Sequence, residues 1–510
     1  MPTQKTTRRN FMKAGAALAL GANVVMAGAR RSDRPNLLFL WTDEQRRDTF
    51  AAGGNKRIHA PNLNQLASES VVFTQAYCTQ PVCTPSRSSV MTGWWPHQDG
   101  CVKNNIPLRP ETKALPEILN DPDYRTAYMG KWHLGDEIYA QHGFEEWVAI
   151  EDGYSKHYGE SRDKNDRSAY FHYLKSLGLE PDPKSNTFGR GFCARLPIEQ
   201  CKPEFLKRNA IDFLKRHKNE PFILCLNYLE PHMPFYGPLD DEHSPDEVTL
   251  PANFDDPLED NEPLRYRLMR QHFYENGFDK IDLKTEAGWR RLIANYWGLV
   301  TQVDRSVGGI QTALEDLGLA DNTLVVYTRD HGDMMGSHRL LTKTVSYEES
   351  VGIPWLIRAP QQGRSQKIIK HPVSQIDMVP TLLDLMGKPE EKAPFPGHSL
   401  VPAMQGGEFG EDHVYVEWNT FSQDLVPKSL PEEVKEDANR AQNAQWRMAV
   451  SPDGWKLCLC DRDKSQLYNL KDDPYETTNL FDSGKHQDVI DRLSKKIHGW
   501  QGEVGDTVEV

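Results

Sequence analysis

The chain has 510 residues, too many for one compact core of the commonest size, so we expect two domains, one of them large. Its hydrophobic, aromatic and charged fractions are those of an ordinary globular protein. The 60 basic and 73 acidic residues give a net charge of −13, which argues against nucleic acid as a general partner. A local basic pocket in such a protein could still bind an anionic substrate.

The first 29 residues are typical of an export signal. Arg8 and Arg9 precede a short apolar run rich in Ala and Gly, which ends in a segment suited to cleavage, Ala27-Gly28-Ala29. The paired arginines resemble a bacterial twin-arginine signal, the alternative being a frayed basic terminus. The run is too short and mild for a membrane span, and no cysteine follows it for a lipid anchor. We therefore expect export by the twin-arginine machinery to the periplasm or outside the cell, with no stable membrane anchor.

Short apolar runs then alternate with helical patterns. Asn36–Trp41 is a short apolar run that predicts a buried strand leading into Asp43 and Glu44. Pro85 suits the first turn of a helix over residues 84–92, with Cys83 at its N-terminus. Further on, strands are expected within 124–135, 221–235 and 322–333, and helices within 60–73, 203–217 and 294–319. This alternation predicts a large α/β domain, whose mostly parallel mixed sheet is flanked by helices.

From about residue 396 the pattern changes. Short strands within 413–419, 446–460 and 466–470 and a final helix within 486–500 predict a smaller C-terminal α+β domain with a short antiparallel sheet. We expect the boundary between residues 30–395 and 396–510. Two charged segments, 151–200 and 236–290, are expected to be irregular loops around a site. Eight cysteines do not make a disulfide scaffold in a chain of this size; Cys193 and Cys201 are close enough in sequence to pair, but no pairing can be assigned.

Polar residues follow the apolar strands. Asp43, His232 and Asp330 each come after one, and ligands of such sheets bind beyond the carboxyl ends of the strands. Carboxylates gathered there repel each other unless a cation joins them, and hard oxygen ligands favour Ca²⁺ or Mg²⁺. A lone Asp-Glu pair would otherwise be read as a solvated loop or a helix cap.

Three basic residues are candidates for holding an anion: Arg87, Lys131 and Lys343. Each alone would be read as a surface charge. His133 and His232 could move protons near neutral pH. The helix N-terminus expected at Cys83 also favours an anion, through its backbone N–H groups and dipole.

Six motifs occur along the chain in a characteristic order: TDEQ, CTPSR, GKWHLG, EPHMPF, DHGDMMGSH and LLTK. Together they resemble the type I sulfatases of the alkaline phosphatase superfamily. The resemblance extends over roughly residues 34–480, since the late stretch from Trp455 to Leu480 also looks like the end of that family. It implies an alkaline phosphatase-like fold and identifies residues 30–395 as the catalytic domain.

The resemblance also implies a mechanism. The motif cysteine, Cys83, is oxidised by a formylglycine-generating maturation enzyme; one hydroxyl of the aldehyde hydrate attacks sulfur, and the other is deprotonated to expel sulfate. Carried over by position, Arg87 holds the hydrate and His133 is the base that collapses it. Lys131 and Lys343 contact the sulfate, and His232 with Lys343 helps to protonate the leaving oxygen. The metal positions are matched by Asp43, Glu44, Cys83, Asp330 and His331.

Two departures bear on the metal. Many relatives have Asp-Asp where this chain has Asp43-Glu44, and many have Asp-Asn where it has Asp330-His331. Asp-His occurs in some sulfatases and in the related phosphonate monoester hydrolases, some of which hold manganese. One divalent metal is expected, Ca²⁺, with Mn²⁺ as the runner-up.

The leading hypothesis is an exported sulfatase acting on a sulfated carbohydrate. Aromatic and polar residues near the motifs could meet sugar rings or could simply pack the core: Trp94, Trp95, His97, Tyr154, His157 and Tyr158. The first alternative is a phosphonate monoester or phosphodiester hydrolase with the same nucleophile. The second is a catalytically silent protein that binds sulfated glycans.

Overall fold

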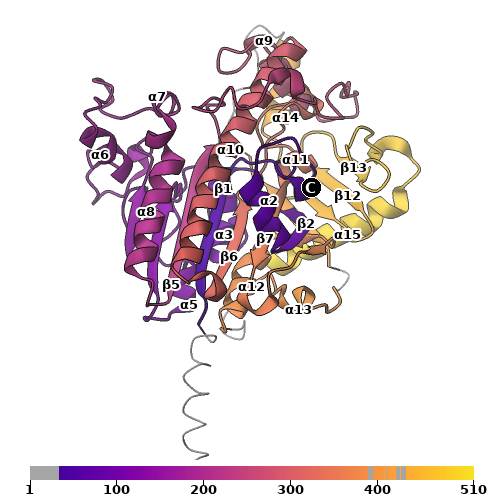
Figure 1. The fold of residues 1–510 in the computed structure, drawn as a ribbon. Helices are drawn as coiled ribbons and strands as arrows, with labels where there is room; N and C mark the ends of the chain where they lie inside the picture. The colour runs from indigo at the N-terminus through magenta and orange to yellow at the C-terminus, as the bar shows by residue number, and fades with distance from the viewer. Residues whose placement is uncertain (1–33, 389–393, 410–411, 421–424, 427–431) are drawn as a thin grey trace, which may run out of the picture.

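The computed structural model describes residues 34–388, 394–409, 412–420, 425–426 and 432–510. The expected signal segment, residues 1–29, lies outside them. Two sheets organise the chain, a large mixed sheet and a smaller antiparallel one. Figure 1 shows the large sheet behind the long helix α10 (Glu286–Asp316), with the smaller sheet to its right.

The large sheet has nine strands, in the order β4-β3-β5-β1-β6-β7-β2-β8, with β9 beside β2. All pairings are parallel except those that β7 makes with β6 and β2. The predicted mostly parallel mixed sheet is therefore confirmed. Its strands are β1 (Asn36–Asp43), β2 (Val71–Tyr77), β3 (Arg125–Gly130), β4 (Glu146–Ala149), β5 (Phe222–Pro231), β6 (Thr323–Arg329), β7 (Gly352–Arg358), β8 (Lys367–Ile369) and β9 (Val373–Ser374).

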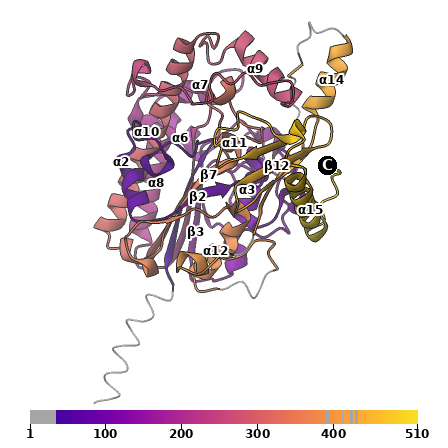
Figure 2. The same ribbon diagram turned by 90° about the vertical axis from the view of Figure 1, so that its right-hand side faces the viewer.

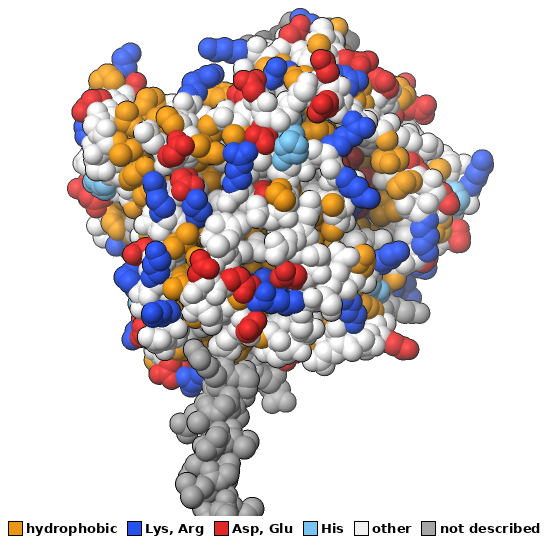
Figure 3. All heavy atoms as spheres, in the orientation of Figure 1, with side chains coloured by type: hydrophobic (Ala, Val, Ile, Leu, Met, Phe, Trp, Pro, Cys, Tyr) orange, Lys and Arg blue, Asp and Glu red, His pale blue; other side chains and the backbone are white. Residues whose placement is uncertain are grey.

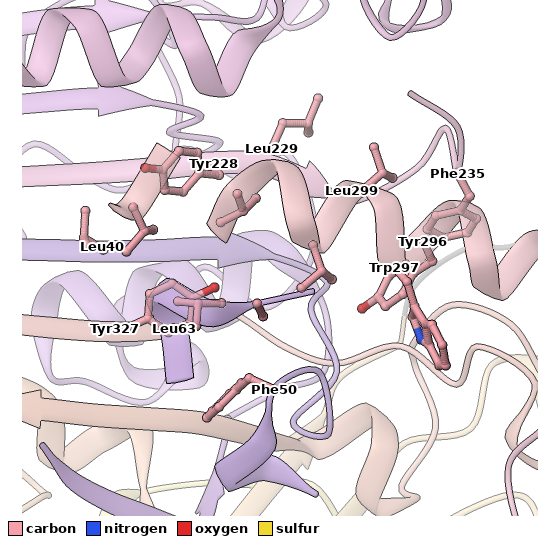
Figure 4. Packing of buried hydrophobic residues seen from close by; sticks show 14 of the residues in the cluster. Leu40, Phe50, Leu63, Tyr228, Leu229, Phe235, Tyr296, Trp297, Leu299 and Tyr327 are labelled. Atoms are coloured by element: carbon pink, nitrogen blue, oxygen red, sulfur yellow. The ribbon is translucent and has the colours of Figure 1, made fainter. Parts of the chain in front are cut away.

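Helices cover both faces of this sheet. Alternate residues of β1 enter different cores, since Leu38 and Leu40 pack on one face while Leu37 and Phe39 pack on the other. The first core is closed by α10, α2 (Pro61–Ser68) and α8 (Lys202–Arg216), and Figure 4 shows its packing around Leu40 and Leu63. The second core is closed by α3 (Cys83–Thr92), α5 (Leu115–Leu119) and α12 (Met378–Leu385). A sheet covered on both faces explains why its strands are apolar runs without alternation.

The C-terminal domain contains four antiparallel strands and a final helix. The strands are β10 (Val414–Trp418), β11 (Trp446–Val450), β12 (Trp455–Cys460) and β13 (Gln466–Asn469), paired in chain order. The final helix, α15 (Gln487–Val504), packs on β11 and β12 through Leu493 and Ile497. Figure 2 shows this helix next to β12. The predicted α+β domain is confirmed, while its boundary at residue 395 stays a prediction.

Several elements were not predicted. The segments expected to be irregular contain α6 (Ala169–Ser176), α7 (Arg190–Cys193) and α9 (Leu264–Asn276), and the second domain also contains α14 (Glu432–Gln442). Three short helices complete the α-helices of the described residues: α4 (Pro96–Asp99), α11 (Glu348–Val351) and α13 (Val401–Met404). One of several 3-10 turns lies at Ser155–His157. The segments 151–200 and 236–290, expected to be irregular, are therefore partly helical.

The remaining expectations concern cysteines and membranes. All eight cysteines are free, so Cys193 and Cys201 do not pair. Within the described ranges, no helix combines the length and apolarity needed to cross a bilayer. On the face in Figure 3, acidic and basic side chains are interspersed.

Candidate active site

Four adjacent strands end at the same place in the large sheet. In the spatial order β3, β5, β1 and β6 they deliver Lys131, His232, Asp43 and Asp330. The strands run parallel, so their carboxyl ends share one edge. The structure thus brings together residues that lie almost 300 positions apart in the sequence, as the motif order predicts.

Cys83 lies among these side chains, at the first position of α3. Its Sγ is 3.4 Å from both His331 Nε2 and Lys343 Nζ, and 3.8 Å from Asp43 Oδ1. Lys131 Nζ is 3.9 Å from the same Sγ and also contacts the Asp43 carboxylate. Burial, followed by the Asp43 charge, raises the pKa of the thiol, so as a cysteine this group stays protonated and is a poor nucleophile.

Arg87, one turn further along α3, ties two carboxylates together. Its Nε donates to Asp330 Oδ2 at 3.0 Å and its Nη2 to Asp43 Oδ2 at 2.9 Å. Nη1 donates to the Lys131 carbonyl at 2.9 Å and to Asn227 Oδ1 at 3.1 Å. The fully buried guanidinium therefore ties β1, β3, β5 and β6 to α3.

Asp43 and Glu44 differ in charge state although they are neighbours. Burial would raise the pKa of Asp43, but Lys131, His232 and Arg87 hold it well below its usual range. Burial dominates at Glu44 and raises its pKa to about 8, against the pull of Lys343. Glu44 Oε2 is 3.0 Å from Lys343 Nζ and 3.4 Å from His232 Nε2.

The same residues fit a divalent cation. Asp43, Cys83, Asp330 and His331 each offer a ligand atom, and these atoms lie within 4.8 Å of one another. His331 Nδ1 donates to the Gly332 carbonyl at 3.0 Å, which orients Nε2 toward the cluster as metal-binding imidazoles require. Buried Glu44 Oε1 has no hydrogen-bond partner among the described residues, as expected of an oxygen that a cation completes. The carboxylate oxygens suit a hard cation such as Ca²⁺ or Mn²⁺, whereas the Cys83 sulfur and the His331 imidazole are softer donors.

His133 lies at the edge of this cluster. Its Nε2 donates to Asn105 Oδ1 at 3.0 Å, and its Nδ1 has no hydrogen-bond partner among the described residues. Burial, followed by the charges of Lys131 and Arg87, lowers its pKa well below the usual value. The ring is therefore neutral, with Nδ1 free to accept a proton. Within the described ranges, no hydrogen bond joins its side chain to Cys83.

The aromatic and histidine residues proposed from the sequence to meet sugar rings fall into two groups by location. Trp95 and His97 pack against Trp500 of the C-terminal helix, with ring centroids 5.0 and 6.1 Å apart. Trp94 faces Phe395 at 6.2 Å. Trp95 is buried in these contacts, whereas Trp94 and His97 are half-buried.

The second group lies closer to the site. The Tyr154 ring is 4.4 Å from that of His133 and is half-buried. Tyr158 is buried against Tyr139 at 5.7 Å, as the core-packing alternative predicts, and His157 is half-buried on the turn between them. Among the ring contacts of the described residues, Tyr154 is the member of this group that touches a residue of the candidate active site.

Several neighbours of the site carry no sequence signal. Asn227 lies in the middle of an apolar strand, and Asn105 in a loop without a motif. Gln375 accepts from Ser86 Oγ at 2.9 Å and donates to the Asp330 carbonyl at 3.2 Å. Glu137 lies four residues after His133, whose backbone N–H it accepts at 2.6 Å. Each acts through tertiary proximity, which spacing along the chain does not reveal.

Comparison with known proteins identifies relatives along most of the chain. The family model described as Sulfatase matches residues 35–388, and one described as N-sulphoglucosamine sulphohydrolase, C-terminal, matches residues 336–503. A relative from Formosa agariphila, an ulvan-active sulfatase, is 26% identical and covers 93% of this chain and 82% of its own.

Two solved structures share the fold. One was solved with its substrate D-glucosamine-2-N,6-O-disulfate; it is 22% identical, covers 93% of this chain and 99% of its own, and has a TM-score of 0.73. The other, a phosphonate monoester hydrolase from Silicibacter pomeroyi, is 21% identical, covers 92% and 96%, and has a TM-score of 0.74. At these identities the two likenesses show the fold alone.

Proposed function

The chain belongs to the sulfatase family and is a sulfuric ester hydrolase, and we propose that it removes sulfate from a carbohydrate, with residue 83 as its nucleophile. The observation that carries the proposal is the position of Cys83 Sγ between a carboxylate–imidazole cluster and the ammonium groups of Lys131 and Lys343. A sulfated carbohydrate is supported by a relative named for activity on ulvan and by a fold neighbour solved with a disulfated glucosamine.

The cysteine itself is not the nucleophile in this proposal. Oxidation to formylglycine, followed by addition of water to its aldehyde, would supply two hydroxyl groups at residue 83, whereas the buried and protonated thiol is a poor nucleophile. Arg87 then holds these groups in place through its two carboxylate contacts. His133 accepts a proton at Nδ1, which is unprotonated and without a hydrogen-bond partner among the described residues.

The two lysines bind the sulfate. Lys131 and Lys343 lie within 4 Å of Cys83 Sγ, and the pKa of each is raised because neighbouring anions outweigh burial. Both are therefore charged at neutral pH and offset negative charge as it develops. His232 faces Glu44 and, with Lys343, is on the side where the departing alcohol takes up a proton.

A divalent cation completes the site in this proposal. Asp43, Glu44, Asp330, His331 and residue 83 would hold it, and it would polarise sulfate oxygen as a Lewis acid. We propose Ca²⁺, with Mn²⁺ as the alternative because of His331. Elemental analysis of the purified protein distinguishes them, and stripping the cation with a chelator should abolish turnover until it is restored.

The burial of the cysteine motif bears on when Cys83 can be modified. Cys83 is 2% exposed and Arg87 fully buried, so a formylglycine-generating enzyme must reach them before folding is complete. We propose that this occurs in the cytoplasm, before twin-arginine export of the folded catalytic domain, residues 30–395, with its C-terminal domain, 396–510. Peptide mass spectrometry of the exported protein tests the order, because unmodified Cys83 in active enzyme would refute it.

The alternative substrate is a phosphonate monoester or phosphodiester. It is favoured by the Asp330-His331 pair and by the shared fold of the Silicibacter hydrolase. Rates on aryl sulfate and aryl phosphonate esters with the same leaving group separate the two: we expect kcat/KM to favour the sulfate, and a large preference for the phosphonate would overturn the proposal. A silent glycan-binding protein would hydrolyse neither ester.

A further inference from the structure

An excess positive charge lies in the wall of the site beside His232. Buried Glu151 pairs with two cations, Lys202 through Oε1 and Arg190 through Oε2, the latter at 2.6 Å. Burial opposes ionisation of Glu151, but Arg190 and Lys202 lower its pKa to about 2. One carboxylate therefore balances two cations. Two further carboxylates act on this pair of cations: Asp43 on Arg190, and Glu230 on Lys202, where burial raises the Glu230 pKa to about 7.

Arg190 also has a donor without a good acceptor. Its Nε donates to Glu151 Oε2 at 2.6 Å, and its Nη2 donates to the Tyr154 hydroxyl at 2.9 Å. The remaining group, Nη1, is only 3.4 Å from His232 Nδ1. That nitrogen carries a hydrogen, because it lies 2.9 Å from the Met233 carbonyl, to which it can only donate. Nη1 therefore points toward the site with an unused N–H.

The position of Arg190 suits contact with a bound substrate. The side chain is 29% exposed, unlike that of Lys202 at 4%. It lies beside Tyr154, whose ring contacts His133, and beside His232, whose other nitrogen faces Glu44. Arg190 thus belongs to the rim of the site, whereas Lys131 and Lys343 lie at its base next to Cys83.

We propose that Arg190 binds a second anionic group of the substrate, a carboxylate or a further sulfate near the ester that is cleaved. The planar fork of arginine is suited to either oxyanion, and its orientation is already set by Glu151 and Tyr154. This proposal rests on the proposed function and narrows it, from any sulfated carbohydrate to a polyanionic one.

The test uses pairs of sulfated disaccharides that differ by one group. In one set the extra group is a carboxylate on the neighbouring ring, and in the other it is a second sulfate, so the two sets identify which anion is recognised. A charge-assisted hydrogen bond is worth about 1.5–3 kcal/mol, so the wild type should prefer one extended member by about tenfold or more in kcat/KM. Arg190→Gln should reduce that preference to about twofold, mainly through KM, and Arg190→Lys should retain part of it.

A matched control comes from the same segment. Arg195→Gln removes the same charge five residues away, where the exposed guanidinium lies over the Tyr236 ring, and should keep the preference. Arg190→Gln leaves Glu151 paired with Lys202, so the fold is expected to survive, and a melting curve checks this. Arg190→Lys, which keeps the charge, serves if the glutamine variant does not fold.

Other outcomes overturn the proposal. A wild type that shows no preference in either set would contradict it. An Arg190→Gln variant that slows both members of each pair by the same factor would also contradict it, because an equal effect indicates that Arg190 only positions His232. If no disaccharide is hydrolysed, the proposed function fails instead. Calorimetric binding of the same pairs to Cys83→Ala protein then decides on Arg190, because equal affinity within every pair would refute its role.

Discussion

Arg87 joins the carboxylates at the ends of β1 and β6 through a single guanidinium. Lysine keeps the charge but can reach only one of these partners, leaving the other carboxylate buried with fewer donors. Breaking a buried ion pair costs about 3–5 kcal/mol. We therefore expect Arg87→Lys to lower the melting temperature by several degrees and to reduce kcat about 100-fold or more.

The exposed pair Arg364–Glu315 supplies the control for that experiment. Arg364→Lys changes the same chemistry where solvent screens the charges, so melting temperature and activity should stay close to those of the wild type. Equal effects of the two substitutions would mean that the buried fork has no special role.

For single residues, the sequence predicts membership of the site where the residue lies in a motif and misses it where it does not. Asp43, Cys83, Arg87, Lys131, Asp330 and Lys343 were expected at one site and do lie together. Asn227 and Arg190 were not expected. The first is one polar residue in an apolar strand, and the second is one of many charges in a long connecting segment, so nothing in their spacing separates them from structural residues.

Among the elements, the end of β3 depends on a glycine. Gly130 has φ of 120°, and a Cβ there would lie 1.8 Å from the Asn227 carbonyl oxygen of β5. Alanine would force β3 and β5 apart just where Lys131 and Asn227 enter the site. Gly130→Ala should therefore reduce kcat strongly and destabilise the fold by about 1–3 kcal/mol, measured by turnover and thermal melting.

Gly499 provides the matched substitution. It lies within α15, and a Cβ there meets nothing within 4 Å. Gly499→Ala should leave activity intact and slightly raise stability, because alanine is the better helix former. If Gly130→Ala behaved in the same way, close approach of the strands could not be what positions Lys131.

Helix α9 shows why some elements are not predicted from the sequence. No local residue caps it: the backbone N–H groups of Leu264 and Arg265 donate to the carboxylate of Asp463, each at 3.0 Å. Asp463 lies almost 200 residues later, in the C-terminal domain. A cap supplied from such a distance leaves no signal at the start of the helix, whereas α10 is capped locally by Thr285, whose hydroxyl accepts from the Gly288 N–H at 3.1 Å.

At the scale of the molecule, α4 docks the catalytic domain onto the C-terminal one. His97 Nδ1 is 2.5 Å from Glu417 of β10, and His97 Nε2 is 3.2 Å from the Val504 carbonyl of α15. Burial disfavours protonation of His97, but Glu417 outweighs it and raises the pKa above 6.5. The stabilisation is therefore complete below pH 6.5 and is lost as the pH rises through the raised pKa.

Melting curves at several pH values test this docking. His97→Gln should melt below the wild type under mildly acidic conditions, and the difference should shrink as the pH rises above the pKa of His97. The exposed His498→Gln on α15 should match the wild type throughout. A His97→Gln deficit that grows with pH would have the wrong sign for this account.

The central claim is tested most directly by sulfate release from defined sulfated oligosaccharides, measured for the wild type and for Cys83→Ala. We predict that the wild type liberates inorganic sulfate from at least one of them and that the variant, with its fold intact, liberates none. Undiminished release by Cys83→Ala would contradict the assignment of the nucleophile. A wild type that leaves every saccharide intact while cleaving aryl phosphonates would contradict the assignment of the substrate.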